Sequence, residues 1–411
     1  MPVGRPYERD RDLDAVTRIW REVGWIDPDE ADEARGLRDF LDVETTLVAD
    51  IAGEAECAVT RSSGVIRHLA DDVPLCVIAA VTTSHVGRRQ GLASALMAES
   101  LAAGAADGAA VAALGMFDQG FYDRFGFGTG VYEHRMVFDP TTMTVPVPSQ
   151  PPVRLTADDA DEMHALLVRR HRGHGSVVLD QPLTVASEFR WTDKPVALGY
   201  RNADGRLTSY LLGAAKGEYG PYEIEWLVYE TPQDLLALLG LIRGLGDQVN
   251  LVTVFAEPPE LQLQDLLRTP MRQRRAVGLA GGSIVTHDAV AEQQFRILDL
   301  RACVEATHLV APPVSLGLRL TDPLASLDGA PWPGIGGDYT LQLGESSTLA
   351  EGLDPALPVL DASVNAFTRL WMGVRPASGL ALTDTLSGPA SLLDALDTAL
   401  RLPTPFAGWV F

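Results

Sequence analysis

The N-terminal part of the chain alternates between the apolar spacing of helices and that of strands. Leu13, Val16, Trp20 and Val23 recur at helical intervals within residues 10–24. A second, acidic helix is expected at about 27–41. The uncharged run 74–82 is typical of a buried strand, and it precedes a helix rich in Ala and Leu that extends to about 106. Further strands are predicted at 46–51, 56–60, 65–69, 109–114 and 131–138, with a short helical segment at 120–125. This order predicts an α/β unit that the last of these strands closes.

A proline-rich linker at 144–152 is the clearest boundary in the chain, and the pattern partly repeats after it. Thr156 gives an N-cap signal before a helix at 160–170. The remaining elements predicted for this unit are strands at 196–200, 207–215, 222–229 and 249–256 and helices at 232–244 and 259–268. The repeat predicts a second unit of related design.

A third unit is expected at 293–411. It begins with a strand that leads into a short helix at 293–300, followed by strands near 315–320 and 339–343 and helices at 361–371 and 388–400. The chain ends in the apolar segment 403–411, whereas chain ends are usually polar and loose. We therefore expect this tail to be held inside the protein or inside an oligomer.

A short turn between the apolar strand and the Ala-rich helix carries the first candidate chemistry. It reads Arg88-Arg89-Gln90-Gly91-Leu92-Ala93. The backbone N–H groups at a helix start are unpaired and the helix dipole favours anions there, so a pyrophosphate fits such a turn. Gly91 allows a close approach, and the two arginines add charged donors. The alternative interpretation is an ordinary helix start with two solvated arginines.

The corresponding junction of the second unit lacks this pattern. It reads Glu230-Thr231-Pro232-Gln233-Asp234, and its proline and acids would repel a pyrophosphate. We therefore expect the second unit to be a degenerate copy that binds no cofactor.

Composition narrows the class of protein. The chain has 411 residues, 46% of them hydrophobic, and a net charge of -22. It shows no secretory leader and no apolar run long enough to span a membrane, which predicts a cytoplasmic protein without a membrane partner. The acidic balance argues against nucleic acid and is compatible with cationic substrates, although solubility alone could account for it. The spacing of Cys and His does not suggest a metal site.

Four motifs together resemble one family. They are the Arg88–Ala93 turn, which resembles the acetyl-coenzyme A loop of GNAT N-acetyltransferases, the segment Gly120–Gly128 (Gly-Phe-Tyr-Asp-Arg-Phe-Gly-Phe-Gly), the segment Ile297–Leu300, and the aromatic C-terminal residue. The chain is similar over its whole length to the enhanced intracellular survival (Eis) aminoglycoside acetyltransferases of actinobacteria. The resemblance implies a catalytic GNAT domain at 1–143, the linker, a degenerate GNAT-like domain at 153–292 and an α+β domain like sterol carrier protein 2 at 293–411. It also implies a homohexamer.

Tyr122 and Phe411 are the candidate catalytic residues. A phenol can donate a proton to the thiolate that leaves during acetyl transfer, and the resemblance implies that Tyr122 is this general acid. In the family the general base is the C-terminal carboxylate, which here belongs to Phe411; a buried carboxylate is the better base because burial raises its pKa. The alternatives are core packing for Tyr122 and simple anchoring of the tail for Phe411.

The resemblance also implies the residues that hold acetyl-coenzyme A, the expected co-substrate, without any metal. They are Val81, Thr82 and Thr83 at the strand end, Arg88, Arg89, Gln90, Gly91, Leu92, Ala93 and Ser94 at the helix start, and Phe117 and Asp118 after the next strand, which should separate from the first to admit the pantetheine arm. The acceptor pocket is expected near Trp25 and Asp27, with Asp29 and Glu30 close by. A solvated acidic helix start is the alternative interpretation for these acids.

The leading prediction is an acetyl-coenzyme A-dependent N-acetyltransferase that acts on small cationic amines, polyamines and aminoglycosides included, and thus confers antibiotic resistance. Two alternatives stay open at this point. One is acetylation of protein lysines. The other is a non-catalytic regulator that binds lipid or acyl-coenzyme A through residues 300–411.

Overall fold

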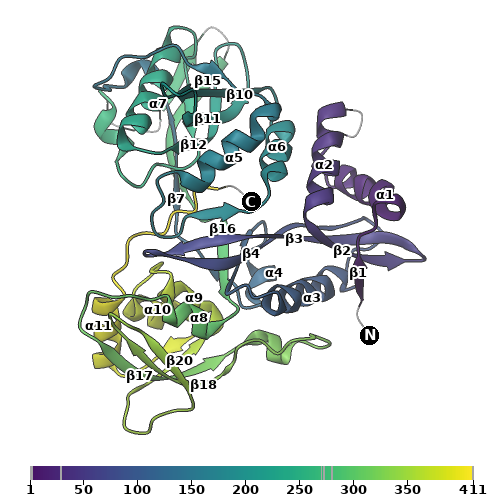
Figure 1. Cartoon of the computed structure of the whole chain (residues 1–411), viewed down its shortest axis with the longest axis vertical. Coiled ribbons are helices and arrows are strands. Elements are labelled where there is room, and N and C mark those ends of the chain that lie inside the picture. The colour runs from purple at the N-terminus through teal and green to yellow at the C-terminus, as the bar shows by residue number, and fades with distance from the viewer. Residues whose placement is uncertain (1–2, 28–29, 270, 272–273, 279–280, 410–411) are drawn as a thin grey trace.

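Three β-sheets organise the computed structural model, which describes residues 3–27, 30–269, 271, 274–278 and 281–409. Figure 1 shows the sheets as three layers along the longest axis, with the first sheet in the middle, the second above it and the third below. One continuous cluster of buried side chains includes residues of all three layers. The layers therefore share a core, and the chain has the mixed α/β architecture that the sequence predicts.

The first sheet has the strand order β1-β2-β3-β4-β5-β16-β6, and β9 pairs with β3. Helices α1 and α2 lie near one end of the sheet and α3 runs beside β3 and β4 (Figure 1). The elements are β1 (Gly4–Pro6), α1 (Arg9–Glu22), α2 (Ala31–Val43), β2 (Thr45–Ile51), β3 (Glu54–His68), β4 (Asp71–Thr83), α3 (Leu92–Ala106), β5 (Val111–Gly115), α4 (Gln119–Asp123), β6 (Gly128–Thr129), β9 (Val177–Leu179) and β16 (Gln293–Ile297).

Strand β3 is continuous, whereas the sequence predicts two short strands at 56–60 and 65–69. The polar stretch between them, which includes Ser62 and Gly64, lies inside the sheet because β9 pairs with it. A Cβ atom at Gly64 would lie 2.2 Å from the carbonyl oxygen of Val178. The glycine therefore marks a close backbone approach within a strand, and the interpretation as a break is wrong.

The second sheet has the order β14-β15-β7-β13-β12-β11-β10-β8. Its elements are β7 (Glu133–Phe138), β8 (Val153–Arg154), α5 (Ala160–Arg169), α6 (Pro182–Trp191), β10 (Pro195–Arg201), β11 (Leu207–Ala215), β12 (Tyr222–Tyr229), α7 (Pro232–Gly244), β13 (Val252–Val254), β14 (Arg274–Gly278) and β15 (Gly281–Val290), with 3-10 turns at Pro140–Thr142, Ala157–Asp159, Leu245–Asp247 and Leu263–Leu266. The helix predicted at 259–268 is reduced to the last of these turns.

Two strands lie in sheets other than those expected. The segment at 131–138 does not close the first unit, because β7 pairs with β13 and β15 of the second sheet. The segment expected to open the third unit, β16, lies between β5 and β6 of the first sheet. Both strands bury apolar side chains, Met136 and Phe138 in one case and Phe295 and Ile297 in the other. An apolar pattern predicts a strand without indicating which sheet it joins.

The third sheet has the order β19-β18-β17-β20-β21. Its elements are α8 (Leu300–Glu305), β17 (Val314–Thr321), a 3-10 turn (Pro323–Ser326), β18 (Gly337–Leu343), β19 (Thr348–Glu351), β20 (Val359–Ser363), α9 (Val364–Trp371), α10 (Ala377–Thr383), β21 (Leu386–Ser387) and α11 (Ala390–Ala399). The likeness of this unit to sterol carrier protein 2, and the domain boundaries, stay predictions.

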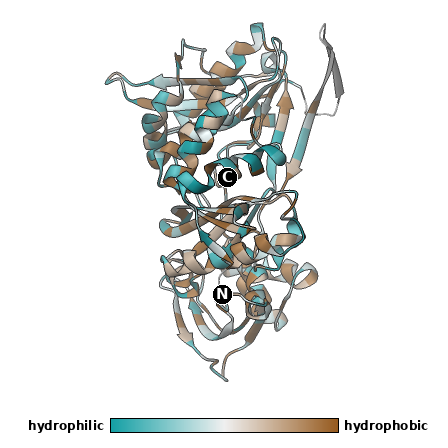
Figure 2. Cartoon of the chain, turned by 90° about the vertical axis from the view of Figure 1, so that its right-hand side faces the viewer, coloured by the Kyte–Doolittle hydropathy of each residue, from teal (hydrophilic) through white to brown (hydrophobic). Residues whose placement is uncertain are grey.

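Hydrophilic residues line helices that face the viewer in Figure 2, and hydrophobic residues are frequent in the strands. None of the described helices is both long and apolar enough to cross a membrane.

Candidate active site

The turn between β4 and α3 leaves the start of the helix open. The N-cap residue Gly91 has a φ of 80° and no side chain, and the first turn of α3 contains no acid. Nothing lies within 4 Å of a Cβ position at Gly91. Arg88 and Arg89 are exposed, and neither forms a salt bridge within the described part of the chain. The turn thus offers free N–H groups and free guanidinium groups to an anion.

Strands β4 and β5 separate just before this turn. They pair in parallel as far as Ile78 and Leu114, after which β4 continues to Thr83 beside β3 alone. The ladder between β3 and β4 is irregular at the same place, and Ala80 has a φ of 51°. An extra residue of this kind twists a strand away from its neighbour. The gap that the pantetheine arm requires is therefore present, and the strand end and the open helix start fit acetyl-coenzyme A.

Tyr122 lies on α4 beside this gap. Its side chain is 1% exposed, and its ring makes edge-to-face contacts with Phe117 and Phe121, at centroid distances of 5.8 and 5.0 Å. Burial, with a smaller contribution from the Asp118 carboxylate, raises the pKa of Tyr122 well above its ordinary value. The phenol therefore keeps its proton at neutral pH, as a general acid must.

One contact orders α4 itself, and another holds it next to the start of α3. Asp118 caps α4 by accepting a hydrogen bond from the Phe121 amide at 3.1 Å. Arg124 follows α4 and donates to the Ser94 hydroxyl in the first turn of α3 at 2.6 Å, while its guanidinium lies over the Phe121 ring. The tyrosine and the turn are thus linked through side chains.

The described part of the C-terminal tail, which reaches Trp409, runs between the first and second sheets, as the yellow segment shows in Figure 1. The Ala407 carbonyl accepts hydrogen bonds from the Val177 amide at 2.9 Å and from Arg170 at 3.0 Å. Arg170 is buried and donates to three carbonyl oxygens, without a carboxylate partner among the described residues. The Trp409 ring is 2% exposed and packs against Trp226 at 5.4 Å. The tail is therefore anchored inside the protein, as its composition predicts. Phe411 lies outside the described residues.

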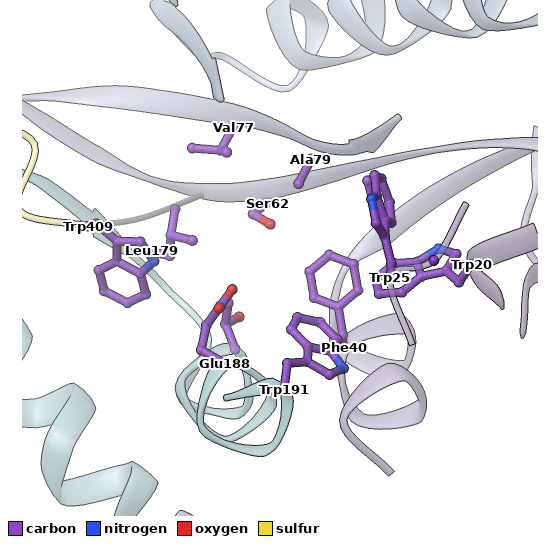
Figure 3. Close-up of a pocket in the computed structure, with 13 residues that line it drawn as sticks. Trp20, Trp25, Phe40, Ser62, Val77, Ala79, Leu179, Glu188, Trp191 and Trp409 are labelled. Carbon is purple, nitrogen blue, oxygen red and sulfur yellow. The ribbon is translucent and has the colours of Figure 1, made fainter. Parts of the chain in front are cut away.

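A pocket of about 420 Å³ opens beside the same part of β4. Strand residues alternate between two faces: Cys76 and Ile78 pack toward α3, whereas Val77 and Ala79 line the pocket on the opposite face. Figure 3 shows Glu188 reaching into the open space, with Trp409 on one side and Phe40 and Trp191 on the other. The complete lining is Trp20, Gly24, Trp25, Phe40, Ser62, Val77, Ala79, Ala80, Leu179, Thr184, Glu188, Trp191 and Trp409.

The comparisons with known proteins agree with this geometry. Residues 5–130 match the model of the acetyltransferase (GNAT) domain. An uncharacterized N-acetyltransferase of Streptomyces avermitilis is 27% identical over 356 residues, which cover 79% of this chain and 78% of that protein. The chain therefore carries a GNAT acetyltransferase domain at residues 5–130 and is an acetyltransferase.

Solved structures extend the likeness to the full length of this acetyltransferase. A probable N-acyltransferase from Enterococcus faecalis V583 has a TM-score of 0.78 at 18% identity and covers 99% of both chains. Eis1 from Mycobacterium abscessus has a TM-score of 0.76 at 17% identity, over 99% of this chain and 100% of that one. Identities this low show the fold alone. The acetyltransferase therefore has an Eis-like fold, as the motifs predict.

The predicted cofactor residues of the acetyltransferase lie along one path. Val81, Thr82 and Thr83 end β4, residues 88–91 form the turn, and Leu92, Ala93 and Ser94 begin α3. Gln90 donates to the Val86 carbonyl at 2.8 Å. Phe117, after β5, is 74% exposed. Asp118 turns its carboxylate toward the start of α4, so its side chain acts as a helix cap in this structure.

The predicted acceptor residues are only partly brought together. Trp25 lines the pocket, and its ring meets Trp20 edge-to-face at 5.2 Å. Asp27 is exposed and is not among the lining residues. Its backbone amide donates a hydrogen bond to the Glu33 carboxylate. Glu30 is exposed as well, and Asp29 lies outside the described residues.

Sequence reasoning misses α6, which supplies Thr184, Glu188 and Trp191 to the pocket of the acetyltransferase. Its start carries a usable signal, because Pro182 occupies the first turn, where proline is favoured. The periodicity of apolar residues in α6 is weak, because the residues that it buries include small ones such as Ala186 and Ser187. Within the described residues, no three His, Cys, Asp or Glu side chains group as metal ligands would.

Proposed function

We propose that the protein transfers an acetyl group directly from acetyl-coenzyme A to a primary amine of a small cationic molecule. The observation that carries this proposal is the gap between β4 and β5, which has Tyr122 near one face of the sheet and the Glu188-containing pocket at the other. A thioester in that gap would meet an acid from one side and an amine from the other. Aminoglycosides and polyamines are the acceptors we propose first, and acetylation of the former would confer antibiotic resistance.

Tyr122 is proposed as the general acid. During transfer the amine nitrogen bonds to the acetyl carbon, the carbon–sulfur bond breaks, and the sulfur needs a proton. The burial of the phenol supports this role, because a pKa above that of a thiol favours the protonated state before transfer. Val81, Thr82, Thr83 and the residues from Arg88 to Ser94 would hold the pantetheine and pyrophosphate groups, with Phe117 and Asp118 at the far side of the gap.

The carboxylate of Phe411 is proposed as the general base that takes the proton of the amine. Support comes from the tail just before it, because Trp409 lines the acceptor pocket and the Trp409 carbonyl accepts a hydrogen bond from Gln293 of β16 at 3.3 Å. The proposal requires that the carboxylate, two residues farther along the chain, reach the amine in this pocket. The homohexamer and the cytoplasmic location stay predictions.

The test measures thiol release from acetyl-coenzyme A in the presence of kanamycin or spermidine. We compare the intact chain with a semisynthetic chain that ends in a carboxamide at Phe411 and with Tyr122→Phe. Each change should lower kcat by roughly 10²- to 10⁴-fold and leave the Kd of acetyl-coenzyme A within about twofold. The matched control is Tyr132→Phe, since Tyr132 is an exposed tyrosine ten positions farther on.

Amine-dependent thiol release that persists in the carboxamide chain would refute the proposed base. Release that persists in Tyr122→Phe would refute the proposed acid. If acetyl-coenzyme A binds but none of the amines reacts, the proposed acceptors are wrong, and acetylation of protein lysines is then measured with the same assay on peptides.

A further inference from the structure

Glu188 is a carboxylate without a cation. It projects from α6 into the acceptor pocket (Figure 3), and it is the only charged side chain among the described residues that line this pocket. Within the described part of the chain its carboxylate forms neither a salt bridge nor a hydrogen bond. Two other acids near α6 do have partners: Glu44 accepts from Thr184 at 2.8 Å, and Asp39 pairs with Arg190.

An unpaired carboxylate in a pocket of this kind is costly. Burial, together with the nearby Glu225 carboxylate, raises the pKa of Glu188 to about 8. At neutral pH the side chain therefore tends to hold its proton while the pocket is empty, whereas an ammonium group that enters the pocket stabilises the carboxylate form. The Glu188 carboxylate therefore favours a cationic ligand whose ammonium group reaches Glu188 inside the pocket.

Apart from Ser62 and Thr184, the other side chains of the lining are apolar. Trp191 packs against Trp20 at 5.4 Å and against Phe40 at 5.5 Å, so the three rings hold one another in place. Aromatic faces attract an ammonium group, and they also bury the hydrocarbon body that carries it. Glu225 is not among the residues that line the pocket, so the described lining gives a counter-ion to one ammonium group and none to a second or third. A polycation would have to leave its additional charges in solvent or desolvate them without partners.

We infer that the pocket selects a primary amine with a single ammonium group on an apolar or aromatic body, and that Glu188 is the specificity-determining residue that holds this ammonium before transfer. This inference rests on the proposed acetyl transfer to a primary amine, and it replaces the polycations proposed first with amines that carry one ammonium group. Arylalkylamines of the size of 2-phenylethylamine should be better acceptors than kanamycin or spermidine. Val77, Ala79 and Ala80 line the pocket on β4, so an amine held by Glu188 lies next to the strand that borders the gap.

The experiment uses the full-length protein and two readouts. Thiol release from acetyl-coenzyme A gives kcat/KM for 2-phenylethylamine, spermidine and kanamycin. Calorimetry gives the binding of 2-phenylethylamine and of 2-phenylethanol, which has the same body without the ammonium group. The variants are Glu188→Gln and the matched control Asp193→Asn, which removes one negative charge from the exposed segment just after α6.

We expect kcat/KM for 2-phenylethylamine to exceed that for the two polycations by at least about tenfold. Glu188→Gln should raise the KM and the Kd for 2-phenylethylamine about tenfold or more and leave the Kd for 2-phenylethanol within about twofold. Retained binding of the alcohol shows that the variant folds and that its pocket is intact. Asp193→Asn should match the unchanged protein in every measurement.

Other outcomes separate the inference from the proposed function. If kanamycin and spermidine are the better acceptors, or if Glu188→Gln binds 2-phenylethylamine as the unchanged protein does, the inference is overturned and acetyl transfer stands. If none of the amines causes thiol release but 2-phenylethylamine binds and Glu188→Gln abolishes this binding, the proposed acceptors fail while the pocket keeps its assigned ligand class.

Discussion

The two strand-to-helix junctions, β4 to α3 and β12 to α7, have the same topology and opposite chemistry. Each follows a strand that pairs in parallel with a later one, β4 with β5 and β12 with β13. At α7 the Thr231 hydroxyl accepts from the Asp234 amide at 3.2 Å, and the Asp234 carboxylate accepts from the Thr231 amide at 3.0 Å. At α3 the cap residue is Gly91, and side chains leave the N–H groups free.

This difference teaches that capping residues, more than the fold, decide whether a junction can hold a phosphate. A capping box uses the same N–H groups that an anion would bind, and its acid repels the anion as well. Pro232 removes a further donor at α7. The second junction is therefore expected to bind no phosphate, because Thr231 and Asp234 cap the helix and Pro232 lacks an N–H group.

The largest expected effect comes from giving α3 an acid in its first turn. Ala93→Asp should raise the Kd of acetyl-coenzyme A about 10- to 100-fold relative to Ala93→Asn, because the carboxylate competes for the N–H groups and repels the pyrophosphate. Calorimetry with acetyl-coenzyme A measures the difference. The asparagine variant is the matched control, since it has nearly the same shape without the charge. Equal Kd values for the two variants would mean that the phosphates bind elsewhere.

A smaller effect is expected from the arginines of the turn. Arg88→Gln and Arg89→Gln should each raise the Kd of acetyl-coenzyme A by roughly tenfold at low salt and by less at high salt, because an exposed charge-assisted hydrogen bond is screened. Arg154→Gln, at an exposed position of β8, removes the same charge and should have no effect. A salt-independent loss would point to altered folding of the turn instead of lost phosphate contacts.

Elements with local signals are the ones that the sequence predicts well. The Ala-rich run predicts α3, Thr231 and Pro232 predict the start of α7, and the turn between β4 and α3 has its expected place. The Eis-like fold follows from the resemblance of four motifs in order. Each of these predictions depends on residues that are close together in the chain.

Features that depend on distant pairing could not be predicted in this way. Strand β7 joins the second sheet and β16 joins the first, because each pairs with a strand more than a hundred positions away in the sequence. The proposed acceptor pocket combines residues of α1, α2, β3, β4, β9, α6 and the tail, so the place of Glu188 in it has no local sequence signal. The open space around Glu188 exists only once α6 lies beside α2. These two helices make extensive contacts with each other.

The converse variant tests the second junction. Thr231→Val removes the capping hydroxyl, so we expect a loss of about 1 kcal/mol of stability and an unchanged Kd for acetyl-coenzyme A. The midpoint of thermal unfolding measures the loss. Thr45→Val, at an exposed position of β2, is the control for loss of a hydroxyl that caps no helix. A raised Kd for acetyl-coenzyme A without lower stability would show that the second junction contributes to cofactor binding.

The smallest effect concerns an unpaired group that no ligand can reach. The His68 ring is fully buried, stacks on Trp371 at 4.1 Å and lies 5.1 Å from the His174 ring, and its Nδ1 atom has no partner among the described residues. Burial, with repulsion from His174 and His308, lowers the pKa of His68 well below its usual value. Here the missing partner affects stability and has no role in binding.

The sign of the pH effect follows from the direction of that shift. The folded protein keeps His68 neutral while the unfolded chain protonates it near pH 6.5, so stability is full above that pH and falls as the pH drops. From pH 7 to 6 the loss should be about 0.7 kcal/mol. We expect the unfolding midpoint of His68→Gln to depend less on pH than that of the unchanged protein, and that of His85→Gln, at an exposed position, to depend on it equally. If the unchanged protein and both variants depend on pH alike, the acid sensitivity does not arise at His68, and its unpaired Nδ1 atom is not the cause.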